Sequence, residues 1–498
     1  MRGAIAAGHP LTAEAGARVL AEGGNAVDAC IAAGFASWVA ESPLTGAGGG
    51  GFMLIHRERD RSTRVLDFFT ATPGRGLDAR AGAEMDEVDI DFSGGTHQVF
   101  KIGPASVAVP GATLGLEKAH RAFGTMPWAE LVSPAAELAR KGFELTRPQG
   151  YLHAILDLIL RHSDEGRRLY GNDGERLVAG ETVRLPDLAG SLELIAAEGA
   201  AAVYGGELGR ALVRVVRDGG GALTEDDLAA YRVIRRRPVR SGYQGREFLS
   251  NPPPSAGGVL IAYGLEMLDR EPPAEPGSAA ALAALAGAMR EQHAARERRG
   301  FEAALYRGGV LRRLERRLVT AGTTHISVVD GAGNAAAMTV STGSGSGVYA
   351  PGTGIGLNNM LGEFHVAAPV PVGERLSSAM SPSLVTEDGR TRLVVGSAGS
   401  LRLRGAVMQV VVNVVGHGLG VEEAISRPRV HLEGGELHCE GGHDPAELDR
   451  LEAMGWELVR WRRHNLYFGG AAAVEVRPDG SLHAAGDSRR GGVGIVVE

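Results

Sequence analysis

The segment AGTTHISVVD, residues 321–330, indicates the fold of this chain more directly than any other stretch. Polar and apolar side chains alternate from His325 to Val328, which is typical of a β-strand, and Asp330-Gly331 then supplies a turn. After Gly322 the sequence pattern changes, and predicted β-hairpins dominate. We therefore expect a large part, 1–322, and a smaller part, 323–498, that begins at Thr323.

The composition restricts the class of protein. The chain has 498 residues, of which 44% are hydrophobic and 22% charged, enough for a sizeable core. A net charge of -7 argues against nucleic-acid or anionic-membrane partners, which need basic patches. Only Cys30 and Cys439 occur, which excludes a disulfide framework and leaves no zinc or other metal site. No apolar run approaches the about 18 residues of a membrane span, and no signal peptide is evident, so we expect a cytoplasmic protein.

Glycine and alanine dominate the start of the chain. Periodicity predicts helices over 11–22 and 25–39. The glycine-rich run 46–51 leads into a strand instead of a Gly-Lys-Ser/Thr ending and a helix, which disfavours a phosphate-binding loop. Close approach of the backbone to a neighbouring element or ligand explains the glycines better. We further expect a strand at 64–69, an acidic irregular surface loop at 81–97 and a short strand at 107–111.

The two parts differ in their expected elements. The large part contains a helical region at about 112–230 and a linker at about 271–322. Its predicted helices are 113–123, 127–142, 149–162, 187–198, 206–217, a short one capped by Thr224, 258–269 and 290–317, with strands at 231–240 and 246–250. The small part is predicted to hold the hairpins 325–330 with 334–341, 383–388 with 392–396 and 472–484, and helices at 404–417 and 445–455.

Short motifs along nearly the whole chain resemble those of one enzyme family. Each is weak alone, but their number and order are specific, and the chain resembles the gamma-glutamyltranspeptidase family of N-terminal-nucleophile hydrolases. The resemblance implies an α+β fold: a four-layer αββα sandwich built from a large and a small fragment of one precursor. The motifs lie at residues 8–10, 23–28, 48–53, 124–127, 251–255, 323–325, 357–359, 380–382, 396–399 and 487–490.

In this context Thr323 is expected to be a nucleophile that first cuts its own chain after Gly322. A threonine hydroxyl needs an adjacent base. Attack of its Oγ on the Gly322 carbonyl, an N-to-O shift and hydrolysis would free an α-amino group, whose ordinary pKa of about 7.7–8.0 suits a general base. Glycine before the bond leaves room for the attack. The resemblance implies no cofactor and two fragments that remain together as a heterodimer, alone or in pairs.

Four further residues are implied by the resemblance to assist the reaction. Thr339 and Ser341 fall where the family places hydroxyls close to the nucleophile, and Ser341 is the better match for the hydroxyl that hydrogen-bonds it. Gly399 and Ser400 align with paired glycines whose backbone amides stabilise the oxyanion of acyl transfer. Ser400 departs from glycine, although its amide can still donate.

The residues expected to bind the substrate depart from the family pattern. The arginine that grips the α-carboxylate of a γ-glutamyl group is matched by Phe69, which cannot make a bidentate ion pair. Gly343 and Met360 replace two polar residues, while Glu363 keeps the acidic charge that holds the α-ammonium. Further candidates for the substrate site are Ser377 and Ser378, whose register is shifted by the extra Ala379, and Arg402 or Arg75 as replacement cations.

Three functions remain open from the sequence. The first is a gamma-glutamyltransferase or glutathione hydrolase that passes an acyl group to water or an amine. The second is an amidohydrolase of the same fold for a non-glutamyl acyl amide, such as an oxamate-like compound or an acylated β-lactam. The third is a non-catalytic homologue. An ordinary serine triad is disfavoured, because Gly343 to Gly347 match the Gly-x-Ser-x-Gly elbow in letters but no helix follows them.

Overall fold

The computed structural model describes residues 2–78, 84–91, 97–297, 323–363, 370–399 and 402–498. Its centre is a seven-stranded antiparallel sheet in which β13 and β14, the hairpin that opens the small part, lie between β2 and β1. The order across this sheet is β10 (Ile234–Arg236), β3 (Ser62–Phe68), β2 (Gly50–Arg57), β14 (Ala335–Ser341), β13 (Thr324–Asp330), β1 (Gly3–Ala7) and β24 (Val493–Val497).

A second, six-stranded antiparallel sheet packs against the first. Its order is β11 (Val239–Tyr243), β12 (Arg246–Ser250), β17 (Ser383–Glu387), β18 (Arg390–Ala398), β22 (Gly470–Val476) and β23 (Leu482–Gly486). Apolar side chains from both sheets share one core, which includes Phe52 and Ala337 from the first sheet and Leu384 and Val474 from the second. Each sheet combines strands from before and after Thr323, so the two parts of the chain form one core.

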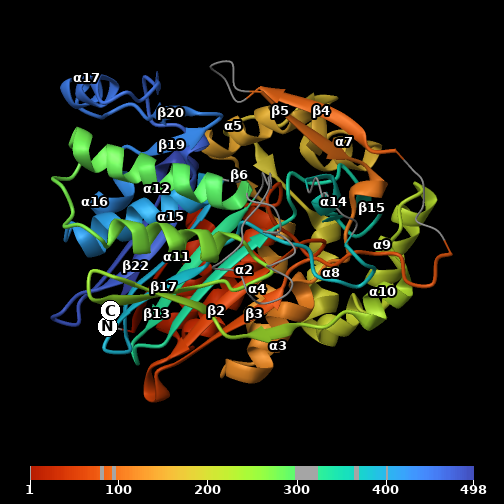
Figure 1. Ribbon diagram of the computed structural model, residues 1–498. Coiled ribbons are helices and arrows are strands. Elements are labelled where there is room, and N and C mark those ends of the chain that lie inside the picture. The colour runs from red at the N-terminus through yellow and green to blue at the C-terminus, as the bar shows by residue number, and fades with distance from the viewer. Residues whose placement is uncertain (1, 79–83, 92–96, 298–322, 364–369, 400–401) are drawn as a thin grey trace.

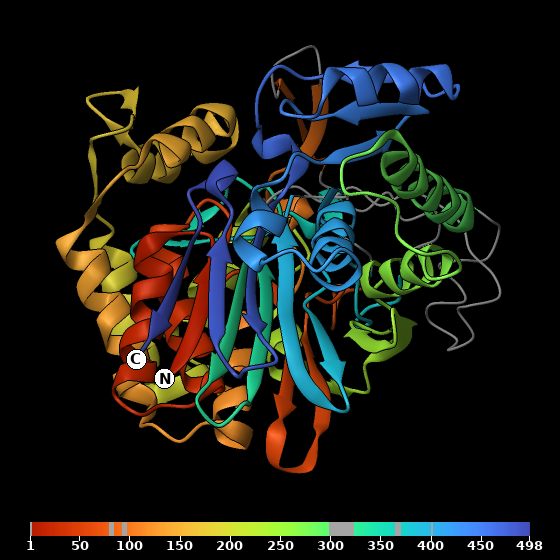
Figure 2. The ribbon, with the colours of Figure 1, turned by 90° about the vertical axis from the view of Figure 1, so that its left-hand side faces the viewer.

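Helices cover the outer face of each sheet (Figures 1 and 2). The first sheet packs against α1 (Pro10–Ala21), α2 (Ala26–Ala40) and α3 (Ala112–Phe123). The second packs against α11 (Gly257–Leu268), α12 (Ala279–Glu297) and α15 (Leu403–Val411), which continues as a π-helix over Val412–Gly416. Among the described residues, no helix is long and apolar enough to cross a bilayer.

The remaining elements surround this framework. Helices are α4 (Trp128–Lys141), α5 (Arg147–Ile155), α6 (Asp157–Leu160), α7 (Asp164–Tyr170), α8 (Pro186–Glu198), α9 (Glu207–Asp218), α10 (Glu225–Ala230), α14 (Met360–Glu363), α16 (Val421–Ser426) and α17 (Pro445–Ala453). Short strands are β4 (Asp86–Asp91), β5 (His97–Ile102), β6 (Phe143–Glu144), β7 (Gly171–Asn172), β8 (Glu175–Arg176), β9 (Thr182–Val183), β15 (Tyr349–Ala350), β16 (Ile355–Gly356), β19 (Val430–Glu433), β20 (Glu436–Cys439) and β21 (Leu458–Arg460).

Most elements expected from the sequence are confirmed within a few residues, including the Thr224 cap, whose hydroxyl accepts from the Asp227 amide. The prediction of an irregular loop at 81–97 is wrong for residues 86–91, which form β4 and pair antiparallel with β5, while 81–83 and 92–96 lie outside the described residues. The strand expected at 107–111 is only a bridge between Val109 and Ala71.

The strand expected at 231–240 is divided between β10 of one sheet and β11 of the other. Pro238 stands between these strands and lacks an amide for a ladder hydrogen bond. The predicted linker is also only partly a loop, since α12 begins at Ala279, and its remainder from residue 298 lies outside the described residues.

Candidate functional site

Thr323 lies at one end of the paired sheets, immediately before β13 begins. In the same region β1 ends at Ala7, β18 ends at Ala398 and β22 begins at Gly470. These strand ends surround a cavity, and Thr323 is 1% exposed in its wall. The other lining residues are Gly8, His9, Ala40, Glu41, Pro43, Leu44, Pro148, Gln149, Leu152, His153, Thr324, His325, Ala398, Leu466, Gly470, Ala471, Asp487, Arg489 and Arg490.

The two adjacent threonines face opposite sides of the sheet, as successive strand residues do. Thr324 points toward the helices, where its Oγ1 donates a hydrogen bond of 2.6 Å to Glu41 Oε2. His325 points toward the second sheet, because a Cβ on Gly396 of β18 would lie 2.2 Å from its ring. Alternation puts Thr323 on the same face as His325. The Thr323 hydroxyl therefore lies on the face opposite to the Glu41 carboxylate, which binds the Thr324 hydroxyl.

Ser341 lies across the ladder from Thr323. The β13–β14 ladder pairs Thr324 with Val340 and His325 with Thr339, and one more step places Thr323 opposite Ser341. The Ser341 hydroxyl oxygen accepts a hydrogen bond of 2.7 Å from the Gly343 amide, which orients it within the turn after β14. Cross-strand neighbours have Cβ atoms about 5 Å apart, so the two hydroxyls are within reach of each other.

The Thr339 hydroxyl is directed to a buried imidazole. His325 Nδ1 lies 2.8 Å from Thr339 Oγ1, and its Nε2 lies 2.9 Å from Ser327 Oγ. Ser327 donates its only hydroxyl hydrogen to the carbonyl of Ala472, so it accepts from Nε2–H, and Nδ1 accepts from Thr339. Burial lowers the pKa of His325 to about 3, which keeps the ring neutral. Thr339 thus orients His325, and Ser327, on the same strand as His325, connects to the second sheet through the Ala472 carbonyl.

Gly399 follows β18 at the same end of the sheets. Its φ of +124° suits glycine, and a Cβ there would lie 2.7 Å from the Cα of Gly469. This backbone conformation therefore requires a residue without a side chain. Ser400, the other residue expected to donate an amide, lies outside the described residues, as does Gly322.

Comparison with known proteins establishes the family. The family model for gamma-glutamyltranspeptidase matches residues 12–306 and 311–497. The chain belongs to the gamma-glutamyltranspeptidase family. It is 35% identical over 536 residues to the acylase ACY 1 proenzyme of Pseudomonas sp. (strain SE83), covering 100% of this chain and 94% of the relative. It is 32% identical over 540 residues to the glutathione hydrolase proenzyme of Escherichia coli (strain K12), covering 98% and 90%.

Solved structures support the fold of this family member. The crystal structure of a cephalosporin acylase from Bacillus halodurans superposes with a TM-score of 0.85 at 23% identity, covering 100% of this chain and 96% of that one. The likeness to this structure concerns the mixed α/β fold alone. Members of the family are hydrolases and transferases. One of the two relatives above is named as the proenzyme of an acylase, and the other as the proenzyme of a glutathione hydrolase.

Phe69 is confined between the sheets of this family member. Its ring stacks on Phe52 with centroids 5.4 Å apart, and its carbonyl accepts hydrogen bonds from Tyr231 (2.6 Å) and from Arg375 Nη1 (2.9 Å). Arg375 was not among the residues predicted from the sequence. This arginine already forms a buried ion pair with Asp67 (3.2 Å), so it stabilises the turn after β3.

The two replacement cations expected from the sequence occupy different places in the structure. Arg402 is buried, and its guanidinium carbon lies 4.3 Å from the centroid of the Tyr467 ring. Its Nη1 lies 3.8 Å from Glu433 Oε2. Arg75 is exposed and lines a different hollow, together with Tyr231 and Arg375. Neither of these arginines lines the cavity that contains Thr323.

Gly343 and Glu363 meet in a tight turn after β14. Glu363 Oε1 accepts a hydrogen bond of 2.8 Å from the Ser344 amide. Gly343 has a φ of +74°, and a Cβ on it would lie 2.1 Å from Asn359 Oδ1. The side chains of Asn359 and Glu363 thus occupy the space that a side chain at this position would need. Met360 lies in the core between the sheets, fully buried.

Ser377 and Ser378 bind the proline-rich loop before α11. Ser377 Oγ donates to the Pro254 carbonyl (2.8 Å), and the Ser378 carbonyl accepts from Ser255 Oγ (2.9 Å). The Ser378 hydroxyl itself accepts from the Met380 amide at 3.1 Å. These contacts join two family motifs that are far apart in the sequence.

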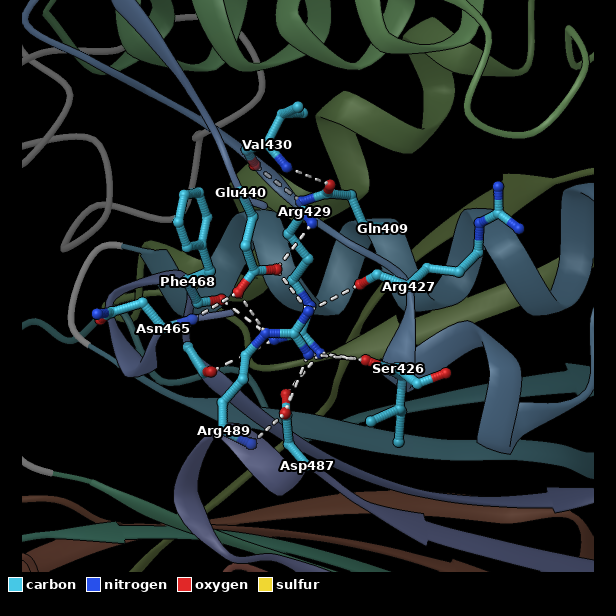
Figure 3. Close-up of polar contacts among 12 residues, drawn as sticks. Gln409, Ser426, Arg427, Arg429, Val430, Glu440, Asn465, Phe468, Asp487 and Arg489 are labelled. Atoms are coloured by element: carbon cyan, nitrogen blue, oxygen red, sulfur yellow. Dashed lines mark hydrogen bonds and ion pairs between the residues drawn. The ribbon is translucent and has the colours of Figure 1, made fainter. Parts of the chain in front are cut away.

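A buried ion network, to which the sequence assigned no role, supports the floor of the cavity (Figure 3). Arg429 Nη2 lies 2.6 Å from Asp487 Oδ2, and Arg489 bonds Asp487 Oδ1 (3.0 Å) and Glu440 Oε1 (2.7 Å). Burial alone would raise the pKa of Asp487, but Arg429 and Arg489 outweigh it and hold this pKa below the ordinary value. The network fixes the short 3-10 helix Ser488–Arg490, which carries Arg490 to the cavity.

Proposed function

We propose that this chain is an autoprocessed amide hydrolase or acyltransferase whose nucleophile is Thr323. The observation that supports this proposal is that two neighbouring hydroxyls point to opposite faces of the sheet. Thr324 is bound to Glu41 in the helix layer, and Thr323 faces Ser341 across the ladder. Cleavage after Gly322 would leave a heterodimer of two fragments. Because both parts contribute strands to each sheet, the fragments would stay associated as an αββα sandwich.

The chemistry follows from the proposed nucleophile. The new α-amino group takes the proton of Thr323 Oγ as the oxygen attacks the carbonyl carbon of the amide. The proton passes to the leaving nitrogen, the C–N bond breaks and an ester on Thr323 remains. Water or an amine then attacks this ester and restores the hydroxyl. The Gly399 amide is the proposed oxyanion donor, together with that of Ser400.

Two acyl groups are candidates for the substrate. A γ-glutamyl amide such as glutathione is supported by family membership and by Glu363, whose carboxylate is retained. An acyl group without an α-carboxylate is supported by Phe69, because a core phenyl ring stacked on Phe52 stands where the family resemblance places an arginine to pair with that carboxylate. The names of the acylase relatives support this second candidate.

Denaturing electrophoresis with N-terminal sequencing tests the nucleophile. The purified protein should give two bands, the smaller beginning at Thr323, whereas Thr323→Ala should give one. Thr324→Ser is the matched control, because it keeps the hydroxyl that binds Glu41 and should leave cleavage intact. Cleavage at the same bond in Thr323→Ala would refute the mechanism. Rates of hydrolysis by the processed protein are then compared for γ-glutamyl, oxamyl and simple acyl p-nitroanilides, which identifies the preferred acyl group.

A further inference from the structure

A second hollow, of about 350 Å³, opens between the loop after β3, the start of β10 and the segment 373–375. Among the described residues, none lines both this hollow and the cavity that contains Thr323. The chain as a whole has a net charge of -7, yet this hollow gathers positive side chains. Four arginines line it, namely Arg75, Arg232, Arg236 and Arg375.

Two of the four arginines share one buried carboxylate. Arg236 Nε donates to Asp67 Oδ2 (2.7 Å), and Arg375 Nε lies 3.2 Å from Asp67 Oδ1. A single negative charge thus faces two positive charges. Arg375 also covers the Tyr231 ring, with 4.5 Å between its guanidinium carbon and the ring centroid. These four residues form a fixed back wall for the hollow.

Arg75 is placed at the hollow by the loop after β3. Asp227 accepts hydrogen bonds from the Gly74 amide (2.7 Å) and from the Arg75 amide (3.0 Å), which fixes this loop. The Arg75 guanidinium packs against Gly373, where a Cβ would lie 2.2 Å from its Nη2. A glycine at 373, with a φ of +83°, therefore leaves the space that the guanidinium occupies. In the described part of the chain, Arg75 forms no ion pair with a carboxylate.

Arg232 is anchored through one nitrogen of its guanidinium group. Its Nη1 donates to the carbonyls of Ala229 and Tyr231, both at 2.7 Å, at the end of α10. Its own carbonyl accepts a hydrogen bond from Arg375 Nη2, which joins it to the back wall. Within the described ranges, Nε and Nη2 of Arg232 bind no protein acceptor, so both can donate to a ligand.

The charge and the lining of the hollow indicate the kind of ligand. The four arginines exceed the carboxylates around them, those of Asp67, Asp227 and Glu374, by one charge. A monoanion would therefore neutralise the hollow. A guanidinium group presents a planar fork of donors that matches a carboxylate. Apolar side chains complete the wall and suit a hydrocarbon body: Ala71, Val109, Ile234, Pro253 and Pro254.

We propose that this hollow is a binding site for a small organic carboxylate. The carboxylate group would pair with Arg75 and Arg232, whose side chains are exposed and can adjust to it. The apolar body would lie against the alanine, valine and proline side chains of the wall. The volume lies within the range of about 300–1,000 Å³ that is typical of small-molecule sites. Arg75 would then serve this site, instead of replacing the arginine that grips a γ-glutamyl α-carboxylate.

Fluorine NMR titration of the purified protein tests the site without requiring turnover. The probes are 4-fluorobenzoate, 4-fluorobenzamide and 4-fluorophenyl phosphate, which share a ring and differ in charge. Wild type should bind the benzoate most tightly. Arg75→Gln and Arg232→Gln should each weaken benzoate binding about fivefold and leave the benzamide unchanged, since an exposed ion pair is lost. Arg237→Gln is the matched control, because Arg237 is an exposed arginine of the same segment that does not line the hollow, and it should change neither affinity.

Equal binding of the benzoate and the benzamide by wild type would overturn the proposal. A benzoate affinity that both Arg75→Gln and Arg232→Gln retain would also overturn it, and would place the benzoate elsewhere, such as beside Thr323. Equal weakening in Arg237→Gln would reduce the effect to the general field of the arginines. Tighter binding of the phosphate ester would reject the carboxylate as the ligand. Arg75→Lys, which keeps the charge without the planar fork, should give an intermediate affinity.

Discussion

His325 and Thr339 face each other directly across β13 and β14, and 2.8 Å separates His325 Nδ1 from Thr339 Oγ1. The hydrogen bond between them assigns different tasks to two hydroxyls of β14. Thr339 orients a neutral, buried ring, whereas Ser341, two residues later on the same face, lies opposite Thr323. This division separates a stabilising residue from the one expected to touch the nucleophile.

Thr339→Val should therefore lower stability more than catalysis. The substitution leaves His325 Nδ1 buried without a donor, which costs about 1–3 kcal/mol, while the rate per processed molecule should fall less than about tenfold, roughly 1.4 kcal/mol. Ser341→Ala should instead slow self-cleavage and turnover more than it lowers stability. Urea unfolding and active-site-normalised rates measure both. A larger catalytic loss in Thr339→Val than in Ser341→Ala would assign the nucleophile's partner to Thr339.

Gly343→Ala should be far more damaging than an alanine at a glycine of equal conformation. Gly352 has a φ of +72° against +74° for Gly343, but a Cβ on Gly352 meets no atom within 4 Å. Both substitutions bear the left-handed strain of about 1–2 kcal/mol. Gly343→Ala also forces Asn359 out of place, which should add about 1–3 kcal/mol. Thermal unfolding of the two variants isolates the clash, and equal loss would show that the turn adapts.

Phe69→Arg should not create a γ-glutamyl site, although it supplies the side chain expected from the family. The position lies in the core between the sheets and stacks on Phe52. A guanidinium there would be buried without a partner, and loss of the phenyl packing alone costs about 3–5 kcal/mol. We expect a poor yield of folded, processed protein. Phe69→Leu is the control for lost ring packing. A well-folded Phe69→Arg with a lower KM for γ-glutamyl-p-nitroanilide would contradict this expectation.

Local patterns predicted much of the fold, since β13, β14 and α2 follow from periodicity, and the motif order predicted the family. β1 was missed, because Gly3–Ala7 is buried on both faces and so has no alternation to detect. The placement of substrate-site residues was harder to foresee. Arg375 and Arg490 reach their positions through contacts with residues distant in sequence, and although Arg490 lies in the motif 487–490, that motif does not indicate which residues its side chain meets. Gly343 looked like a lost polar group, and only the proximity of Asn359 explains it.

Buried histidines should make the protein sensitive to mild acid. Burial lowers the pKa of His9 and His153 to about 4 and that of His325 to about 3. In the unfolded chain a histidine titrates near a pKa of about 6.5, so between about pH 6.5 and 4 the unfolded state binds more protons. Stability should thus be complete above about pH 6.5 and fall on acidification by up to about 1.4 kcal/mol per pH unit for each histidine.

Urea unfolding from neutral to mildly acidic pH measures this slope. His153→Leu should reduce it by about one proton, whereas His464→Gln, at an exposed position, should not. An unchanged slope in His153→Leu would show that this ring is already protonated in the folded protein.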